Sequence, residues 1–252
     1  MATDVISGRE KFFVPKPLPG VNTTFPENLV SLCASAIFAG LSKSELMEVV
    51  SCARVRVFAR NELLYSQGQT NRSLIVLQSG SVKHTQLSSN GDEVLLRMSG
   101  RGEAVNLQAS PTSCSHTCSA RAMEQCHAWV WEYNRVHELL ERYPQLRQNI
   151  TKVLASRLHE LEERFREVAT EKVARRLALV LIRLLKQVGK ESADGVELSL
   201  TREELAQMTG TTLFTISRVL SRWAEQGLVT PKREAVIIKD AKRLDMVSEE
   251  EY

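Results

Sequence analysis

The 252-residue sequence lacks the features that mark several protein classes. Its apolar runs are too short to cross a bilayer and no signal-like segment opens it, so we expect a cytoplasmic protein without membrane contact. Five cysteines, an odd number without a secretion signal, argue against a disulfide scaffold. No glycine-rich phosphate loop, H-E-x-x-H sequence or nucleophile elbow is present. Isolated histidines such as His84 are expected to be ordinary core or surface residues and not catalytic ones. The sequence therefore does not predict an enzyme, and its net charge of +3 agrees with DNA contact without requiring it.

Residues 201–227 predict two short helices joined by a tight turn. Thr201 and Glu204 form a capping box, Gly210 supplies a turn with positive φ, and Thr212 can cap the second helix. The spacing is that of a DNA-binding helix-turn-helix, although an ordinary helical hairpin is the alternative. The DNA-binding interpretation is favoured because the outward residues suit phosphates and base edges. The candidate DNA contacts are Thr201, Arg202, Thr212, Leu213, Phe214, Ser217, Arg218 and Arg222.

Two short apolar runs follow the second helix, at residues 228–230 and 235–238. They predict a hairpin whose basic tip contains Lys232. Such a hairpin is a wing, and we expect Lys232 to lie along the DNA backbone.

The stretch between residues 55 and 131 predicts short β-strands. Its apolar residues alternate in part, and Gly68, Gly80, Gly91 and Gly102 separate the runs at intervals of eleven or twelve residues. Asn90 followed by Gly91 is a strong hairpin signal. Evenly spaced short strands predict an antiparallel roll or sandwich whose interior suits a small ligand.

These motifs stand in a fixed order: residues 38–42, Gly68, residues 79–82, 90–91 and 102–103, then the winged helix-turn-helix. The order resembles that of the Crp/Fnr superfamily of bacterial transcription regulators, over about residues 29–240. The resemblance implies an α+β fold with an N-terminal antiparallel, jelly-roll-like β-roll of the cyclic-nucleotide-binding type, a long dimerisation helix and a C-terminal winged helix-turn-helix domain. We expect an N-terminal arm at 1–26, an effector-sensing β-roll at 27–143, the dimerisation helix at 144–169 and the DNA-binding domain at 170–252.

The resemblance also implies a function, namely sequence-specific binding of a homodimer to double-stranded DNA with a two-fold operator, and RNA polymerase as a further partner. The alternative is a β-roll module that binds a ligand and acts through protein partners. The intact helix-turn-helix argues against this alternative.

The segment after Pro144 predicts a long helix, because neither glycine nor proline follows before Gly189. Its apolar residues recur at steps of three and four and form a coiled-coil seam of about three heptads. We expect the seam to pair with a second copy, although packing on its own domain is the alternative. The pattern breaks near Ala169, which predicts a hinge, and a second amphipathic helix then opens the DNA-binding domain. The seam residues are Ile150, Leu154, Leu158, Leu161, Phe165 and Val168.

The effector site implied by the resemblance is only partly present. In cyclic-AMP-responsive members a Gly-Glu pair and an Arg-Ser pair hold the phosphate, and hydroxyls on the long helix hold adenine. Gly102 and Glu103 match the first pair, whereas His116 and Thr117 replace the second and Leu161 with Glu162 replaces the hydroxyls. Without the arginine fork, the sequence predicts that cyclic AMP binds poorly or not at all. Arg121 lies nearby in the sequence, but strand alternation need not aim it at the same pocket.

Cysteines and histidines gather close to the same region, at Cys114, His116, Cys118 and Cys126. They could bind a soft metal, ligate haem or form a redox disulfide, but the spacing is not that of a common metal site, and a polar loop with a buried structural Cys126 is the favoured interpretation. The cofactor therefore stays open between these possibilities. An iron–sulfur cluster of the Fnr kind is not expected, because it needs clustered N-terminal cysteines, which this chain lacks.

Overall fold

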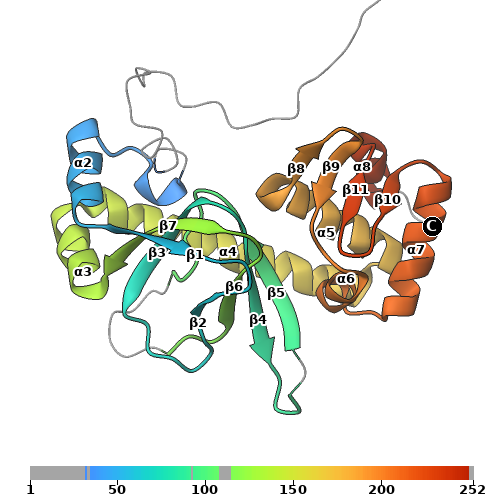
Figure 1. Ribbon diagram of the computed structural model, residues 1–252, viewed down its shortest axis with the longest axis horizontal. Coiled ribbons are helices and arrows are strands. Elements are labelled where there is room, and N and C mark those ends of the chain that lie inside the picture. The colour runs from blue at the N-terminus through green and yellow to red at the C-terminus, as the bar shows by residue number, and fades with distance from the viewer. Residues whose placement is uncertain (1–31, 33–34, 92, 108–114, 250–252) are drawn as a thin grey trace, which may run out of the picture.

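The computed structural model describes residues 32, 35–91, 93–107 and 115–249. A β-rich N-terminal domain and a smaller C-terminal domain lie side by side, and one long helix connects them (Figure 1). The expected N-terminal arm at 1–26 lies outside the described residues. Within the described part, no helix is both long and apolar enough to cross a membrane.

The N-terminal domain begins with a short 3₁₀ helix, η1 (Ala36–Phe38), and helix α2 (Lys43–Ser51). The capping box that starts α2 is formed, because Glu45 N–H donates to Ser42 Oγ at 3.3 Å and Ser42 N–H donates to Glu45 Oε2 at 2.7 Å. Both helices bury apolar side chains against Trp131 of the β-roll. The local sequence therefore fixes where α2 begins, and packing on the roll fixes where it lies.

Seven strands form the antiparallel β-roll that the sequence predicts. One sheet has the order β1-β7-β3 and the other the order β2-β6-β4-β5. A core that includes Phe58, Leu77 and Val82 is buried within the roll. Gly91, with φ of 87°, makes the turn between β4 and β5. The strands are β1 (Arg54–Phe58), β2 (Leu63–Tyr65), β3 (Ser73–Ser79), β4 (Val82–Leu87), β5 (Glu93–Ser99), β6 (Ser119–Ala122) and β7 (Cys126–Glu132).

A β-bulge interrupts strand β5 at Leu96. Thr85 pairs with Leu95 and His84 pairs with Arg97, so Leu96 is one residue more than the partner strand β4 supplies. An extra residue shifts the alternation of side chains between the two faces of a strand. Leu95 and Met98 consequently join the core of the C-terminal domain, while Arg97 faces a cavity of the β-roll.

The connecting helix α4 (Pro144–Thr170) begins at Pro144 and follows α3 (Tyr133–Arg142). Near its start Asn149 Nδ2 donates to the carbonyl oxygens of Ile37 and Ala39, at 2.9 and 2.7 Å, which fastens α4 to the N-terminal domain. Its end lies one residue from the predicted break: Glu171 is extended, and α5 (Val173–Val188) then begins.

A bidentate ion pair spans the break between α4 and α5. Arg183 Nη1 and Nη2 lie 2.6 and 2.8 Å from the two carboxylate oxygens of Glu167. Glu167 is buried, with 5% of its surface exposed, so the pair is well shielded from water. Because two parallel hydrogen bonds constrain orientation as well as distance, the pair fixes the angle between the two helices.

The C-terminal domain consists of a four-stranded sheet packed with helices. The sheet has the order β10-β11-β9-β8, and a core that includes Leu181, Ile216 and Trp223 lies beneath it. The predicted wing is present as β10 and β11, but the hairpin β8–β9 that extends it was not predicted. The elements are β8 (Lys190–Ser192), β9 (Gly195–Leu198), α6 (Arg202–Thr209), α7 (Leu213–Glu225), β10 (Val229–Pro231), β11 (Val236–Ile238) and α8 (Ala241–Glu249).

The two domains contact each other through β4, β5 and α6. Lys83 Nζ of β4 lies 3.0 Å from Glu204 Oε1 of α6, and the backbone N–H of Leu95 donates to Gln207 Oε1 at 3.2 Å. Figure 1 shows α6 beside the β4–β5 hairpin. The helix-turn-helix is therefore held directly against the β-roll.

Candidate DNA-binding surface and effector cavity

Both helices of the helix-turn-helix begin where the sequence predicts. Thr201 Oγ1 accepts from Glu204 N–H at 3.1 Å, while Thr201 N–H donates to Glu204 Oε2 at 2.9 Å. Gly210 has φ of 62°, the left-handed conformation that permits the tight turn. Thr212 Oγ1 accepts from Thr215 N–H at 3.2 Å and caps α7.

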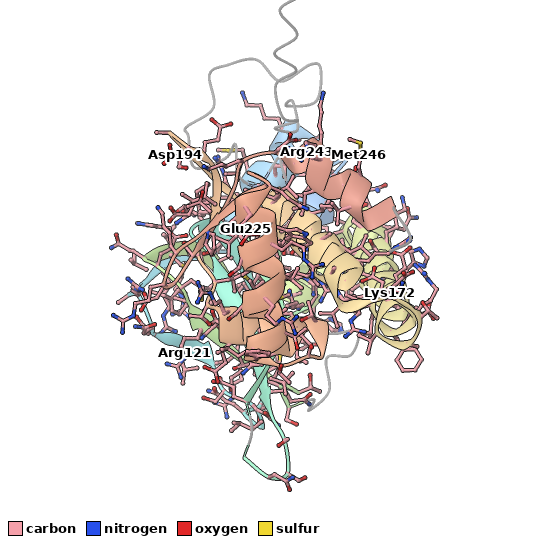
Figure 2. All side chains as sticks on the ribbon, turned by 90° about the vertical axis from the view of Figure 1, so that its right-hand side faces the viewer. Arg121, Lys172, Asp194, Glu225, Arg243 and Met246 are labelled. Carbon is pink, nitrogen blue, oxygen red and sulfur yellow. The ribbon has the colours of Figure 1, made fainter. Side chains whose placement is uncertain are left out.

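Helix α7 has one buried and one exposed face. Ile216, Leu220 and Trp223 are buried, whereas Leu213 and Phe214 are 51% and 68% exposed. Two large apolar side chains at the exposed start of a helix are costly in water unless something covers them. The guanidinium of Arg218 lies 5.8 Å from the ring centroid of Phe214, so both side chains share this surface. In Figure 2 α7 crosses the front of the view, with Glu225 labelled at its end.

The remaining candidate DNA contacts lie around α7 or at the wing. Arg202, Thr212, Arg222 and Lys232 are exposed, whereas Thr201 and Ser217 are partly buried. The hydroxyl of Thr201 is already used in the capping box. Lys232 Nζ lies 2.9 Å from Glu197 Oε2 of β9. A phosphate that contacts Lys232 must therefore compete with this carboxylate.

A cavity of about 950 Å³ lies between the β-roll and α4. Of the six residues predicted for the effector pocket, five line it: Gly102, Glu103, His116, Thr117 and Leu161. Arg121 does not line it, which corrects that prediction. Its guanidinium donates instead to the carbonyl oxygen of Asn61 at 2.7 Å.

Four arginines that the sequence analysis did not predict also line this cavity: Arg97 from β5, Arg101 just after it, and Arg157 and Arg164 from α4. Arg97 donates to Ser99 Oγ at 2.6 Å and to Val105 O at 2.7 Å, Arg157 donates to Ala104 O, and Arg164 donates to Leu96 O at 2.8 Å. Burial, and then the charge of Arg157, lower the pKa of Arg97 to about 10.

A hydrogen-bonded chain of buried groups borders the cavity at Tyr65 and His84. Tyr65 Oη lies 3.3 Å from His84 Nδ1, and His84 Nε2 lies 3.0 Å from Ser99 Oγ. The ring of His116 stacks on that of Tyr65, with centroids 3.7 Å apart. Burial lowers the pKa of His84 well below its ordinary value, so its imidazole is neutral at pH 7. His84 is a core residue that also borders the cavity.

The cysteines give limited support for metal or redox chemistry. Cys118 Sγ lies 4.0 Å from His84 Nδ1, and burial raises the pKa of the Cys118 thiol, which disfavours the reactive thiolate. Cys126 is fully buried and donates to Ser81 O at 3.3 Å, in agreement with a structural role. Cys114 lies outside the described residues. Within the described ranges, no three His, Cys, Asp or Glu side chains are grouped so that they could hold a metal ion.

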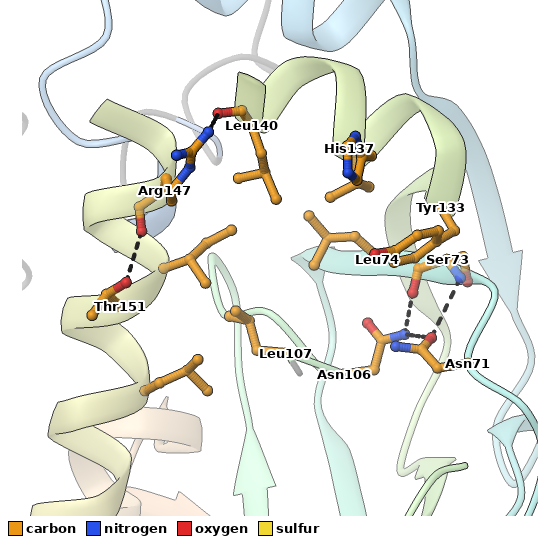
Figure 3. Close-up of a pocket in the computed structure, with 13 residues that line it drawn as sticks. Asn71, Ser73, Leu74, Asn106, Leu107, Tyr133, His137, Leu140, Arg147 and Thr151 are labelled. Carbon is orange, nitrogen blue, oxygen red and sulfur yellow. Dashed lines mark hydrogen bonds between the residues drawn. The ribbon is translucent and has the colours of Figure 1, made fainter. Parts of the chain in front are cut away.

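A second cavity, of about 160 Å³, lies between α3, α4 and β3 (Figure 3). Asn106 lines it but is engaged elsewhere, because its Oδ1 accepts from Ile75 N–H at 2.8 Å and its Nδ2 donates to Asn71 Oδ1 at 3.0 Å. Ile150 and Leu154 of the predicted seam border the same cavity. Ile150 also packs against the core of its own N-terminal domain. Ile150 is therefore covered in part by its own domain, whereas Leu154 is half-exposed beside the cavity.

The C-terminal half of the seam is exposed in the single chain. Leu158, Leu161, Phe165 and Val168 expose between 50% and 77% of their surfaces. Four large apolar residues on one helix form a continuous apolar stripe, which we call the α4 stripe. Such stripes on soluble proteins mark surfaces that another molecule covers.

Models of two known domains match the chain. The cyclic nucleotide-binding domain matches residues 55–143 and the Crp-like helix-turn-helix domain matches residues 175–247. The chain belongs to the Crp/Fnr superfamily. It is a DNA-binding transcription regulator of that type.

Individual relatives of this Crp/Fnr regulator differ in the signal that their names imply. Electron transport regulator A of Shewanella oneidensis is 26% identical over 77% of this chain and 78% of its own length. The cyclic AMP receptor protein of Thermus thermophilus is 27% identical over 85% and 97%. FixK2 from Bradyrhizobium japonicum is a solved structure with a TM-score of 0.68 and 18% identity, covering 79% of this chain and 99% of that one, and it shows the shared fold.

Several residues that line the cavity of this Crp/Fnr regulator were not predicted from the sequence resemblance. Arg97 was not predicted to line the cavity, because the bulge at Leu96 reverses the expected alternation of β5. Arg157 and Arg164 resembled the solvated positions of a coiled coil. The spacing of polar residues along a helix does not reveal which of them are partly buried. The sequence therefore contained no signal that Arg157 and Arg164 line a cavity.

Proposed function

We propose that this regulator acts as a homodimer that binds a two-fold operator, with one α7 helix in each of two successive major grooves. The observation that carries the proposal is the α4 stripe, which lies on the helix that leads directly into the DNA-binding domain. Pairing two copies along this stripe buries the apolar side chains and relates two α7 helices by a two-fold axis. Half-sites then lie about one helical turn of DNA apart.

Within each half-site, Phe214 and Arg218 are the proposed base-reading residues. Both are exposed near the start of α7, the part of a recognition helix that meets base edges. Arginine can donate two hydrogen bonds to guanine, and a phenylalanine ring can pack on the methyl group of thymine. The operator should therefore contain a guanine beneath Arg218 and a thymine beside Phe214.

A selection of operators from random DNA, followed by affinity measurements, tests this proposal. Arg218→Ala should cost about 1–3 kcal/mol on the selected operator and little on random DNA, because only base contacts distinguish the two. Lys232→Ala is the matched control, since a phosphate contact in the wing weakens both alike. Equal losses on both DNAs for Arg218→Ala would contradict base reading, and selection of no preferred sequence would contradict the proposal as a whole.

We further propose that the cavity of about 950 Å³ is the effector site. Cyclic AMP is not the expected effector, because His116 and Thr117 stand where the resemblance places an Arg-Ser pair. Calorimetry that gives a micromolar dissociation constant for cyclic AMP would refute this. RNA polymerase as a partner and a cytoplasmic location remain predictions that follow from the proposed function.

A further inference from the structure

Three of the four arginines that line the cavity, Arg97, Arg157 and Arg164, donate only to neutral oxygens in the described part of the chain. Their recorded acceptors are the carbonyl oxygens of Val105, Ala104 and Leu96 and the hydroxyl of Ser99. None of the three takes part in an ion pair within 4 Å among the described residues, although the protein forms such pairs elsewhere. A shielded cation normally contacts a carboxylate directly, whereas Glu103 and Glu160 act on this cluster only from beyond 4 Å.

The residues that line the whole cavity carry more positive than negative charge. Five cationic side chains line it, Arg97, Arg101, Lys152, Arg157 and Arg164, against two acidic ones, Glu103 and Glu160. Burial also raises the pKa of Glu103, which favours its neutral form. With both carboxylates ionised, the wall carries an excess of three positive charges.

The three guanidinium groups keep donor capacity beyond these hydrogen bonds. Each guanidinium carries five N–H donors. Arg97 makes two recorded hydrogen bonds, and Arg157 and Arg164 make one each.

We propose that Arg97, Arg157 and Arg164 bind a small organic anion that carries at least two negative charges. The shared chemistry is two or more anionic oxygen groups, supplied either by phosphate or by carboxylates, and guanidinium groups suit both. A cyclic mononucleotide brings a single charge, which leaves most of the excess uncompensated. The inference assigns a ligand class to the effector cavity and rests on the proposed function only for its effect on DNA binding.

Burial explains why the anion should bind tightly. Burial first, and then the neighbouring charge of Arg157, lower the pKa of Arg97, in spite of the opposing charge of Glu103. A multivalent anion opposes this shift on binding, so it stabilises the folded state as well as filling the cavity. Water cannot do the same, because it carries no charge.

Calorimetry and thermal unfolding of the full chain at constant ionic strength test the site. The probes are inorganic pyrophosphate for the phosphate source, citrate for the carboxylate source and cyclic AMP for a single charge. We expect pyrophosphate or citrate to bind once per chain and to raise the melting temperature, with cyclic AMP at least tenfold weaker. Arg97→Gln should weaken the better anion at least tenfold, whereas Arg121→Gln, an arginine outside the cavity, should not change it.

A second variant, Arg157→Gln, tests the same site independently in case Arg97→Gln misfolds. Arg157→Gln removes a charge from α4 instead of β5, and circular dichroism verifies that both variants fold. Equal affinities in the wild type and in both cavity variants would overturn the proposal, as would failure of both multivalent anions to bind. Operator binding, measured separately with and without the anion, distinguishes the two proposals: an anion that binds but leaves operator affinity unchanged refutes the effector role and supports the site.

Discussion

Phe165→Ala should weaken dimerisation about a thousandfold. The side chain is 77% exposed on the α4 stripe, and full burial of a phenylalanine contributes about 1.5–3 kcal/mol. Burial of its exposed part in a dimer then contributes about 2 kcal/mol per protomer, or about 4 kcal/mol for both copies. Since about 1.4 kcal/mol corresponds to a tenfold change in affinity, the loss amounts to roughly three powers of ten.

The variant should not disturb the fold of the single chain. Alanine has the highest helix propensity, and the exposed part of the Phe165 ring makes no buried contact that the protomer would lose. Circular dichroism and the melting temperature of the monomer at high dilution verify this. Leu161→Glu is a stronger version of the same test, because it places carboxylates of both copies in an apolar interface.

Sedimentation equilibrium over a wide concentration range measures the dimer dissociation constant directly. Met47→Ala is the control, since Met47 is 51% exposed but lies on α2, away from the stripe. A change of less than tenfold for Phe165→Ala, or a wild-type protein that stays monomeric at micromolar concentration, would refute the assignment of the stripe as the dimer interface.

Three further predictions concern stability. Gly100→Ala would place a methyl group 2.0 Å from the carbonyl oxygen of Gln187, so it should separate β5 from the end of α5, and limited proteolysis between the domains should become faster. Arg183→Met should reduce the free energy of unfolding by about 3–5 kcal/mol in urea titrations, because it leaves the buried carboxylate of Glu167 without its cation. For His84, the folded state disfavours protonation and the unfolded chain takes up a proton below about pH 6.5, so stability should fall as the pH drops from 7 to 5. His84→Gln should make that decline shallower, and an unchanged slope would contradict the assignment.

The parts of the fold that the sequence predicts are those with a local physical cause. The capping box of Thr201 and Glu204 needs only four neighbouring residues, and Gly210 is needed wherever φ must be positive. The end of α4 follows from the loss of apolar periodicity near Ala169. Such features depend on short-range geometry, and the structure confirms each of them.

The parts that escaped prediction depend on residues far apart in the chain. Whether Arg97 faces the cavity depends on a one-residue mismatch between β4 and β5, which no property of β5 alone reveals. The contact between Lys83 and Glu204 joins residues 121 positions apart. Ile150 and Phe165 have the same periodicity, yet only Phe165 is left uncovered, because the N-terminal domain covers the start of α4.

The bulge in β5 also imposes a thermodynamic symmetry on this regulator. Arg97 of strand β5 faces the cavity. The backbone N–H of Leu95, in the same strand, donates to Gln207 of the helix-turn-helix. A ligand that displaces this strand therefore changes the free energy of docking α6. If that docking also sets operator affinity, linkage requires the reverse effect by the same factor, and operator DNA then alters the affinity of the cavity for its ligand. A cell with many occupied operators would thus hold a different share of the ligand than one with few.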